Sequence, residues 1–287
     1  MRWLVTGAHG QLGLDLVEVL RGQDVRAIGR ADCDLRDEAA VRSVVGSWVY
    51  AGDGDAVIVN AAAYTAVDAA EADEDTAAVV NGLAPGWIAA AAGPRARVIQ
   101  VSTDYVFAGN ATAPYEVEDP TGPRTAYGRT KLAGERAVLV TAAHPWVVRT
   151  AWVYGAHGSN FVRTMLRLEA ERETVSVVED QHGSPTWSAQ LARALVELGG
   201  SATPPGVYHC TGAGQTSWLG LAQSVFAAAG ADPGRVLAAS SAEVPRPAPR
   251  PAYSGLSNAS WAAAGLAPLP HWRDAVEDAV PRILAGK

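Results

Sequence analysis

Tyr127 and Lys131 are the pair of side chains whose types and spacing first indicate chemistry, within the segment YGRTK. Residues four apart on a helix share one face, so the Lys131 ammonium is expected beside the Tyr127 phenol. A free phenol has a pKa of about 10, and a nearby cation favours the phenolate and lowers that pKa. The pair is therefore predicted to exchange a proton with a substrate oxygen. Because YxxxK also occurs as an ordinary surface pair, the prediction depends on its context.

A hydroxyl in the segment STDYVF supplies part of that context. Thr103 follows a predicted strand at residues 97–102, and the carboxyl ends of strands face the ligand crevice in open α/β sheets. We expect the Thr103 hydroxyl to hydrogen-bond a reacting carbonyl there. The alternative is that Thr103 only caps the end of the strand. A glycine loop and YGRTK in the same chain favour the catalytic interpretation.

The glycine loop has the sequence GAHGQLG, with glycines at Gly7, Gly10 and Gly13. It lies between a predicted first strand and a predicted first helix, which is the context that a dinucleotide site requires. Gly7 is expected to allow the tight turn, Gly10 the close approach of a pyrophosphate, and Gly13 close packing of helix and sheet. The free N–H groups of the helix N-terminus add a partial positive charge. An ordinary glycine-rich turn is the alternative.

The end of the second predicted strand indicates which dinucleotide binds. An acidic residue usually holds the adenosine ribose there, whereas this chain has Arg30. Arg30 is predicted to meet a 2′-phosphate, which favours NADPH and leaves NADH possible; a solvated arginine is the alternative. Asp34 and Leu35 follow and are expected to line the adenine edge.

The order of predicted elements indicates an α/β fold, because strands alternate with helices along residues 1–150. Right-handed crossovers then give a Rossmann-type doubly wound parallel sheet. Residues 1–150 are predicted to bind the cofactor, and residues 151–287 to form mainly a smaller substrate-binding lobe, with some segments returning to the sheet. The predicted strands are residues 3–6, 25–28, 56–60, 97–102, 146–149 and 207–209, and the predicted helices are residues 11–20, 38–50, 76–92, 125–141, 161–172 and 188–198.

Composition excludes several other classes of protein. The 287 residues carry a net charge of −7, without the basic stripe that nucleic-acid binders show. No signal peptide or apolar stretch of about 20 residues is present, so neither export nor a membrane span is expected. Cys33 and Cys210 match no metal spacing, which favours a reduced, cytoplasmic protein.

Together these residues resemble the extended short-chain dehydrogenase/reductase family, which has an N-terminal GxxGxxG, a Ser or Thr after the fourth strand, and YxxxK. Within it, the resemblance is closest to reductases of dTDP-4-keto-6-deoxysugars and covers nearly the whole chain. The segments that carry it, in chain order, are GAHGQLG, NAAAYTAVDAAE, STDYVFAG, YGRTKLAGE, RTAWVYG, NFVRTMLRL, DQHGSPT, YHCTG and RPAYSGL.

The resemblance implies that hydride passes from NADPH or NADH to C4 of dTDP-4-dehydro-L-rhamnose. Thr103, Tyr127 and Lys131 would form the catalytic triad: Tyr127 protonates the developing alkoxide, Thr103 orients the carbonyl, and Lys131 binds the nicotinamide ribose. The implied cofactor contacts are Gly10, Gln11, Leu12, Asp34, Leu35, Ala61, Ala62, Ala63, Tyr64 and Val101. The implied substrate contacts are Thr103, Asp104, Tyr105, Trp152, Asn160, Trp218 and Arg250.

Several alternatives stay open at this point. One alternative is reduction of another dTDP-4-keto-6-deoxysugar, including one of a dihydrostreptose-type pathway. A related branch of the family is a regulatory subunit that binds cofactor without turning over, but the intact Thr103, Tyr127 and Lys131 argue against it. An epimerase or 4,6-dehydratase is a third class, and a dehydratase would want an acidic pair where Asp104 is followed by Tyr105. No late glutamate cluster is found, so no metal and a monomer or weak homodimer are expected.

Overall fold

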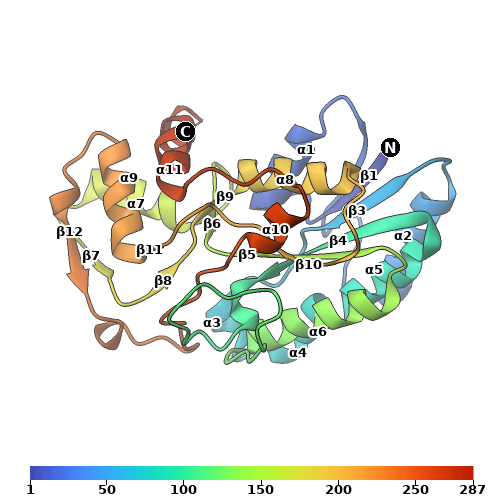
Figure 1. The fold of residues 1–287 in the computed structure, drawn as a ribbon, viewed down its shortest axis with the longest axis horizontal. Coiled ribbons are helices and arrows are strands. Elements are labelled where there is room, and N and C mark those ends of the chain that lie inside the picture. Colours follow the sequence, from blue (N-terminus) through green and yellow to red (C-terminus); the bar gives the residue numbers. More distant parts are fainter. Residues whose placement is uncertain (287) are drawn as a thin grey trace.

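Six parallel strands form the central sheet of the computed structural model, which describes residues 1–286. Their order across the sheet is β10-β5-β4-β3-β1-β2 (Figure 1). The chain runs from β1 outward to β2 and then returns to place β3 on the other side of β1. This reversal opens a crevice at the carboxyl ends of β1 and β3. The strands are β1 (Arg2–Thr6), β2 (Asp24–Ile28), β3 (Ala56–Asn60), β4 (Ala96–Thr103), β5 (Pro145–Thr150) and β10 (Gly206–His209).

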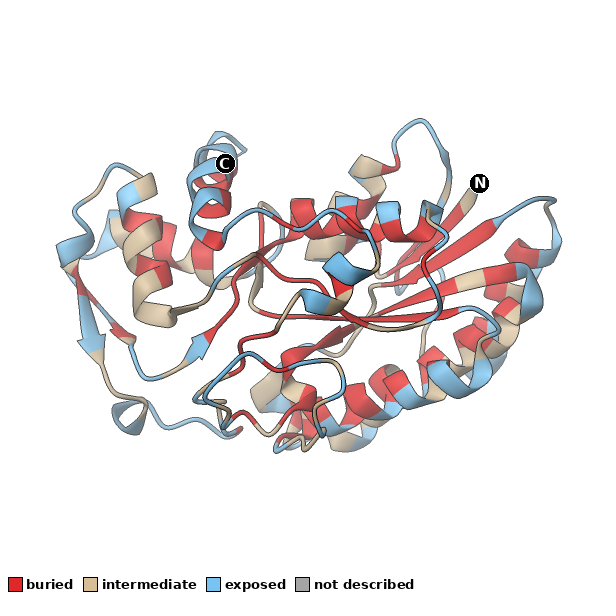
Figure 2. Cartoon of the chain, in the orientation of Figure 1, coloured by how far each residue is buried: buried red, intermediate tan, exposed pale blue. Residues whose placement is uncertain are grey.

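Helices cover both faces of the sheet because its central strands are apolar on both sides. Trp3 and Val5 of β1 pack on one face against α1 (Gln11–Val19) and α8 (Ser188–Gly200), while Leu4 between them packs on the other. That second face is covered by α2 (Glu38–Tyr50), α5 (Ala84–Ala92) and α6 (Ala126–Thr141). Figure 2 shows buried strands between helices whose outer faces are exposed. The result is the three-layer α/β class that the sequence predicts.

The second half of the chain builds a separate apolar cluster and also returns to the sheet. Its strand β10 completes the sheet beside β5, and α8 packs on α1. The separate cluster packs α7, α9 and α11 together with four short strands. The elements of this half outside the sheet are β6 (Val153–Tyr154), α7 (Phe161–Glu171), β7 (Val175–Val178), β8 (His182–Gly183), β9 (Thr186–Trp187), β11 (Thr216–Ser217), α9 (Trp218–Ala228), β12 (Val236–Ala239), α10 (Ala259–Ala263) and α11 (Trp272–Ala285).

The predicted elements of the sheet are confirmed to within about two residues, but one predicted helix is wrong in detail. Residues 76–92 were expected as a continuous helix, and the structure has α4 (Glu74–Ala77), a π-helix η1 (Ala78–Leu83) and then α5. A short α3 (Val67–Ala70) precedes them. The wider turn of a π-helix places one extra residue in the helix and is frequent at functional sites. The remaining short helices are η2 (Gly93–Arg95), η3 (Asp104–Val106), η4 (Pro233–Arg235) and η5 (Ser241–Glu243).

Candidate active site

One large cleft collects the residues that the sequence predicts for the site. It has a volume of about 1220 Å³ and is lined by the loops after β1, β3 and β4 together with residues of the second half. Apolar side chains and a few convergent polar groups are what a ligand site requires. The predicted residues that line it are Gly7, Gly10, Gln11, Leu12, Arg30, Asp34, Leu35, Ala61, Ala62, Ala63, Tyr64, Val101, Thr103, Asp104, Tyr105, Tyr127, Lys131, Trp152, Asn160, Trp218 and Arg250.

The glycine loop is held close to the third strand. Gly7 has a φ of +65°, and a Cβ there would lie 2.7 Å from the Ala62 backbone, so only glycine fits. A Cβ on Gly13 would lie 2.1 Å from the Gly7 carbonyl oxygen. The constraint on Gly13 therefore comes first from the loop itself and not from the sheet. Gly10 caps α1 without a side chain, and the first turn of α1 contains no acidic residue. The free backbone N–H groups at the start of α1 therefore suit a diphosphate.

Two arginines line the end of the cleft beside β2. Arg30 is exposed after β2, where the sequence predicts it. Arg36 also lines the cleft, and its guanidinium lies 2.6 Å from the Asp34 carboxylate. Arg36 lowers the pKa of Asp34 to about 2 by this hydrogen bond. Sequence reasoning missed Arg36, and its signal was only its position two residues after Asp34. The pair of guanidinium groups fits a dinucleotide that carries an additional phosphate.

Asn81 is a second residue that the sequence reasoning missed. It lies in η1, and its side-chain amide binds both backbone groups of Tyr64. Asn81 Oδ1 accepts from the Tyr64 N–H at 2.8 Å, and Nδ2 donates to the Tyr64 carbonyl at 3.1 Å. Nδ2 also lies 3.2 Å from the Thr130 hydroxyl of α6. Asn81 thereby fixes the loop after β3 against the helix that carries Tyr127. A lone asparagine in the apolar run AVVNGL was the available signal.

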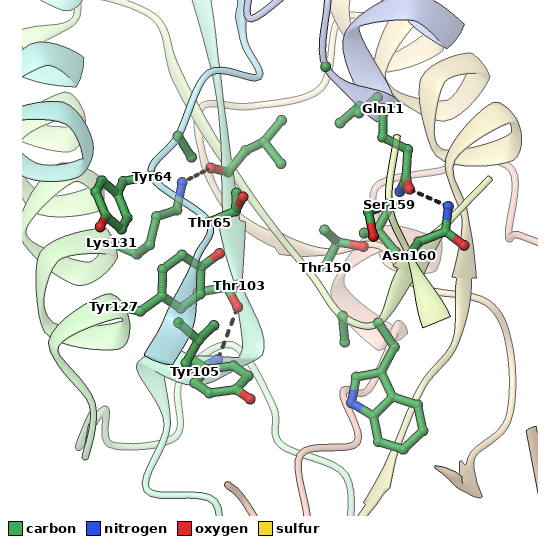
Figure 3. A pocket seen from close by; sticks show the side chains of 18 of the residues that line it. Gln11, Tyr64, Thr65, Thr103, Tyr105, Tyr127, Lys131, Thr150, Ser159 and Asn160 are labelled. Carbon is green, nitrogen blue, oxygen red and sulfur yellow. Dashed lines mark hydrogen bonds between the residues drawn. The ribbon is translucent and has the colours of Figure 1, made fainter. Parts of the chain in front are cut away.

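Lys131 and Tyr127 project from α6 into the cleft, as predicted, but their electrostatics differ from the prediction (Figure 3). The Lys131 ammonium donates to the Val101 carbonyl at 2.7 Å, and burial lowers its pKa to about 8. Burial raises the pKa of Tyr127 to about 12, opposed by a hydrogen bond from Thr103. The expectation that Lys131 lowers the pKa of Tyr127 is therefore wrong for the protein without cofactor. A tyrosine that keeps its proton is suited to act as an acid.

Thr103 serves as a cap and also lines the cleft, where its catalytic role stays a prediction. As the residue before η3, it caps that turn by accepting from the Tyr105 N–H at 3.2 Å. It also faces the cleft beside Tyr127 (Figure 3). Its own proton is donated to Asp104 Oδ1 at 2.9 Å. The Tyr105 ring meets the Tyr127 ring edge-on, with centroids 5.6 Å apart, which fixes the phenol from the other side.

Two stacked tryptophans form the opposite wall. The ring centroids of Trp152 and Trp218 are 3.5 Å apart with planes 4° from parallel, and Phe161 packs against Trp218. Trp152 has a φ of +48°, a backbone strain that a bulky residue rarely carries. Gly183 leaves the space for its indole, since a Cβ there would lie 2.4 Å from Trp152 Cε2. The strained backbone and the missing Cβ together present the Trp152 indole to the cleft.

Asn160 and Arg250 line the cleft but are engaged by protein groups. Asn160 Nδ2 donates to Gln11 Oε1 at 2.8 Å, and its Oδ1 caps α7 by accepting from the Arg163 N–H at 3.0 Å (Figure 3). The bond to Gln11 links the glycine loop to the second half of the chain. Arg250 donates to the Asp68 carboxylate at 2.7 Å, which ties the segment before Tyr253 to α3. Both residues lie where the sequence places them, with these additional partners.

Two further findings concern the described residues as a whole. Across residues 1–286, no group of three or more His, Cys, Asp or Glu side chains is placed to hold a metal ion. In the same range, no helix is both long enough and apolar enough to span a membrane.

The sheet, glycine loop and Tyr127–Lys131 pair define an extended short-chain dehydrogenase/reductase architecture. Residues 1–284 match the model of the RmlD substrate binding domain family, and the chain belongs to that family. A dTDP-4-dehydrorhamnose reductase of Streptomyces griseus is 51% identical, over 98% of this chain and 94% of that protein. A dTDP-4-keto-6-deoxy-D-glucose reductase of Streptomyces niveus is 47% identical, over 99% of this chain and 98% of that protein.

A solved structure is similar over the same extent. The dTDP-4-dehydrorhamnose reductase of Bacillus anthracis in complex with NADP superposes with a TM-score of 0.92 at 35% sequence identity. The match covers 98% of this chain and 99% of that chain.

Proposed function

We propose that this protein reduces the C4 keto group of dTDP-4-dehydro-L-rhamnose to the hydroxyl of dTDP-L-rhamnose, using NADPH and with NADH as a possible second donor. The observation that carries the proposal is the position of Thr103, Tyr127 and Lys131 in one cleft with the glycine loop. The dTDP-4-dehydrorhamnose reductase from Streptomyces griseus, 51% identical over nearly the whole chain, supports the choice of substrate.

The residues present fit a nicotinamide dinucleotide. The Gly7 turn and the uncapped start of α1 hold its diphosphate, and Arg30 and Arg36 meet the 2′-phosphate. When bound, the nicotinamide supplies the hydride. Lys131, which lines the same cleft, is assigned to the nicotinamide ribose. The other residues assigned to the cofactor are Gln11, Leu12, Asp34, Leu35, Ala61, Ala62, Ala63, Tyr64 and Val101.

The keto sugar is assigned to the space between Tyr127 and the tryptophan wall. Thr103 orients the carbonyl by a hydrogen bond, and Tyr127 gives its proton to the oxygen as negative charge develops there. A phenol with a pKa near 12 is protonated at neutral pH, so the acid is in its working form before the substrate binds. Asp104, Tyr105 and Trp152 are assigned to the sugar, and Asn160, Trp218 and Arg250 to the nucleotide.

The two halves of the chain are assigned to different ligands. Residues 1–150 bind mainly cofactor, and residues 151–287 bind mainly substrate. The protein works in the cytoplasm, where its free and buried Cys33 and Cys210 stay reduced. It acts as a monomer or weak homodimer without a metal.

A second candidate is a reductase of another dTDP-4-keto-6-deoxysugar. The Streptomyces niveus relative, named for dTDP-4-keto-6-deoxy-D-glucose, is 47% identical and favours it. This candidate uses the same triad and differs only in the sugar that fits against Tyr105 and Trp152. A regulatory subunit is disfavoured because such a protein has no need for a tyrosine, lysine and threonine held in reacting positions.

A substrate panel tests the proposal. Purified protein is mixed with NADPH or NADH and with dTDP-4-dehydro-L-rhamnose, dTDP-4-keto-6-deoxy-D-glucose or a dTDP sugar without a keto group, and the loss of absorbance of the reduced cofactor is followed. We expect the highest kcat/KM with dTDP-4-dehydro-L-rhamnose and NADPH. Turnover confined to another keto sugar would reject the rhamnose assignment, and no turnover with any of them would reject a reductase.

A further inference from the structure

A buried hydroxyl group without a partner lies in the wall of the cleft. Thr150 is the last residue of β5, lines the cleft, and has only 5% of its surface exposed. Its Oγ1 atom makes no hydrogen bond with any of residues 1–286, although an unpaired buried hydroxyl is unfavourable. No step of the proposed reaction uses Thr150. Its hydroxyl therefore calls for a partner that is bound in the cleft.

The Thr150 hydroxyl lies on the same face of the sheet as the Thr103 hydroxyl. The two residues are paired across the parallel strands β4 and β5. The residues just before them, Ser102 and Arg149, both bind Glu135 of α6 on the opposite face. Because side chains alternate along a strand, Thr103 and Thr150 both point to the face that α1 covers. Figure 3 shows both side chains in the cleft.

The order of the strands indicates which part of a dinucleotide belongs at β5. From the edge of the sheet inward, that order is β2, β1, β3, β4 and β5. Arg30 after β2 is assigned to the 2′-phosphate, Gly7 after β1 to the diphosphate, and Lys131, which donates to a carbonyl of β4, to the nicotinamide ribose. Neighbouring strands lie about 4.8 Å apart, so β5 is one such step beyond the ribose. The nicotinamide ring is therefore assigned to the end of β5, where Thr150 lies.

The chemistry of the nicotinamide ring matches an unpaired hydroxyl. Its only polar substituent is the carboxamide, which has an acceptor oxygen and an amino group that donates. A threonine hydroxyl donates one hydrogen bond and accepts others, so it can satisfy either end of the amide. A sugar hydroxyl is the competing partner. The keto sugar is assigned beside Trp152, which is more exposed than Thr150, and the more deeply buried position is thereby left to the ring of the cofactor.

We propose that the Thr150 hydroxyl binds the nicotinamide carboxamide and fixes the rotation of that ring in the cleft. The inference rests on the proposed use of NADPH. A ring held by its carboxamide keeps one face toward the space beside Tyr127, where the keto carbon is assigned. Thr150 therefore contributes binding free energy only to the half of the cofactor that reacts. The adenosine half is bound without its help.

A ligand that lacks only the nicotinamide ring makes the test selective. This ligand, 2′-phospho-ADP-ribose, keeps the adenosine, the 2′-phosphate, the diphosphate and the second ribose. Thr150→Val removes the hydroxyl and keeps the branched shape. Calorimetric titration gives the Kd of NADPH and of 2′-phospho-ADP-ribose for the wild type and the variant, without a keto sugar. We expect Thr150→Val to raise the Kd of NADPH by about three- to tenfold, as for loss of one hydrogen bond, and to leave the Kd of 2′-phospho-ADP-ribose unchanged.

Two further variants separate the hydroxyl from the shape of the site. Thr150→Ser keeps the hydroxyl without the methyl group and should bind NADPH with a Kd within about twofold of the wild type. Thr164→Val is the matched control, because Thr164 lines the same cleft but already donates to the Asn160 carbonyl at 2.9 Å. Its Kd for NADPH should equal that of the wild type. Without ligand, Thr150→Val should melt no lower than the wild type, since the hydroxyl that it removes has no partner in the described chain.

Three results would reject the contact between Thr150 and the ring. The first is an equal loss of affinity for both ligands in Thr150→Val, and the second is an equal loss of NADPH affinity in Thr150→Val and Thr150→Ser. The third is an unchanged Kd for NADPH in Thr150→Val, and weaker binding of dTDP-L-rhamnose by that variant would then assign the hydroxyl to the sugar. These titrations involve no turnover. A protein that shows the expected Kd values but reduces no keto sugar would therefore reject the proposed function and leave the contact standing.

Discussion

Tyr127 is the residue whose removal tests the chemistry most directly. In the proposed reaction its phenol protonates the substrate oxygen, and its ring packs edge-on against the Tyr105 ring. Tyr127→Phe keeps the ring and its packing but removes the proton. We expect kcat to fall by about 10²- to 10⁴-fold, as for loss of a general acid, with the Kd for NADPH changed little. Steady-state kinetics and a cofactor titration measure the two effects.

The matched control is Tyr208→Phe, which removes a phenol that donates to the Pro204 carbonyl and does not line the cleft. Its kcat should equal that of the wild type. A fully active Tyr127→Phe enzyme would contradict the assignment of the acid.

The buried carboxyl group of Asp104 should make the stability of the protein depend on pH. Its pKa is raised from 3.8 to about 6, so the folded protein binds a proton more tightly than the unfolded chain. The free energy of unfolding must then fall as the pH rises from about 4 to about 6, by about 3 kcal/mol in total from this group. Asp104→Asn should remove this pH-dependent loss of unfolding free energy and be the more stable protein at pH 7. Urea denaturation of both proteins between pH 4 and pH 8 measures the difference.

The other carboxylates of the chain belong to both proteins, so their contributions cancel in that difference. A difference that is constant with pH would contradict the raised pKa.

At the scale of the element, β8 determines the position of the tryptophan wall. Gly183 leaves room for Trp152, and a methyl group there would lie 2.4 Å from its Cε2 atom. Gly183→Ala should displace the indole and destabilise the fold by about 1–3 kcal/mol, as overpacking does. Because the cofactor half is untouched, the KM for the keto sugar should rise while the Kd for NADPH stays constant. Gly200→Ala is the matched control, since nothing lies within 4 Å of a Cβ at that position. Equal KM values for both variants would contradict a sugar contact at Trp152.

The elements of the sheet could be predicted from the sequence, because each buried strand is a short apolar run between polar turns. The π-helix η1 could not be predicted, because its Asn81 bonds to Tyr64 and Thr130, and such contacts between distant residues leave no local pattern in the sequence. The two-residue strands β6, β8, β9 and β11 are too short to show a period. Helix α11 contains Pro281, which hides a helical pattern.

The properties of the candidate site also divide into those that the sequence predicts and those that it does not. Residues in motifs, such as Gly7, Thr103 and Tyr127, could be placed in a common cleft from the order of the strands. The protonation states of these side chains could not be predicted, because they depend on burial in the folded protein. The high pKa of Tyr127 and the orphan oxygen of Asp104 exist only once the chain has closed around them.

At the scale of the whole molecule, the two halves meet across the cleft through Gln11 and Asn160. This bond ties the cofactor loop to α7, so ordering one half should favour binding to the other. Asn160→Ser retains a cap for α7 but cannot reach Gln11. We expect dTDP to bind the wild type more tightly when NADPH is present, by about 1 kcal/mol of coupling, and the variant to lose this difference.

Calorimetric titration of dTDP with and without NADPH measures the coupling in both proteins. Their melting temperatures without ligand should agree within a few degrees, because the cap is preserved. Coupling that survives in Asn160→Ser would mean that the halves communicate by another contact.

The parallel stack of Trp152 and Trp218 gives this protein an optical signal of its own. Two indoles 3.5 Å apart and 4° from parallel share their electronic excitation, so they absorb and emit as a pair. Near-ultraviolet circular dichroism and tryptophan emission should therefore record the arrival of a nucleotide sugar as soon as either ring turns. The wall assigned to the substrate is thus also a built-in chromophore, through which occupancy of the cleft can be followed without any label.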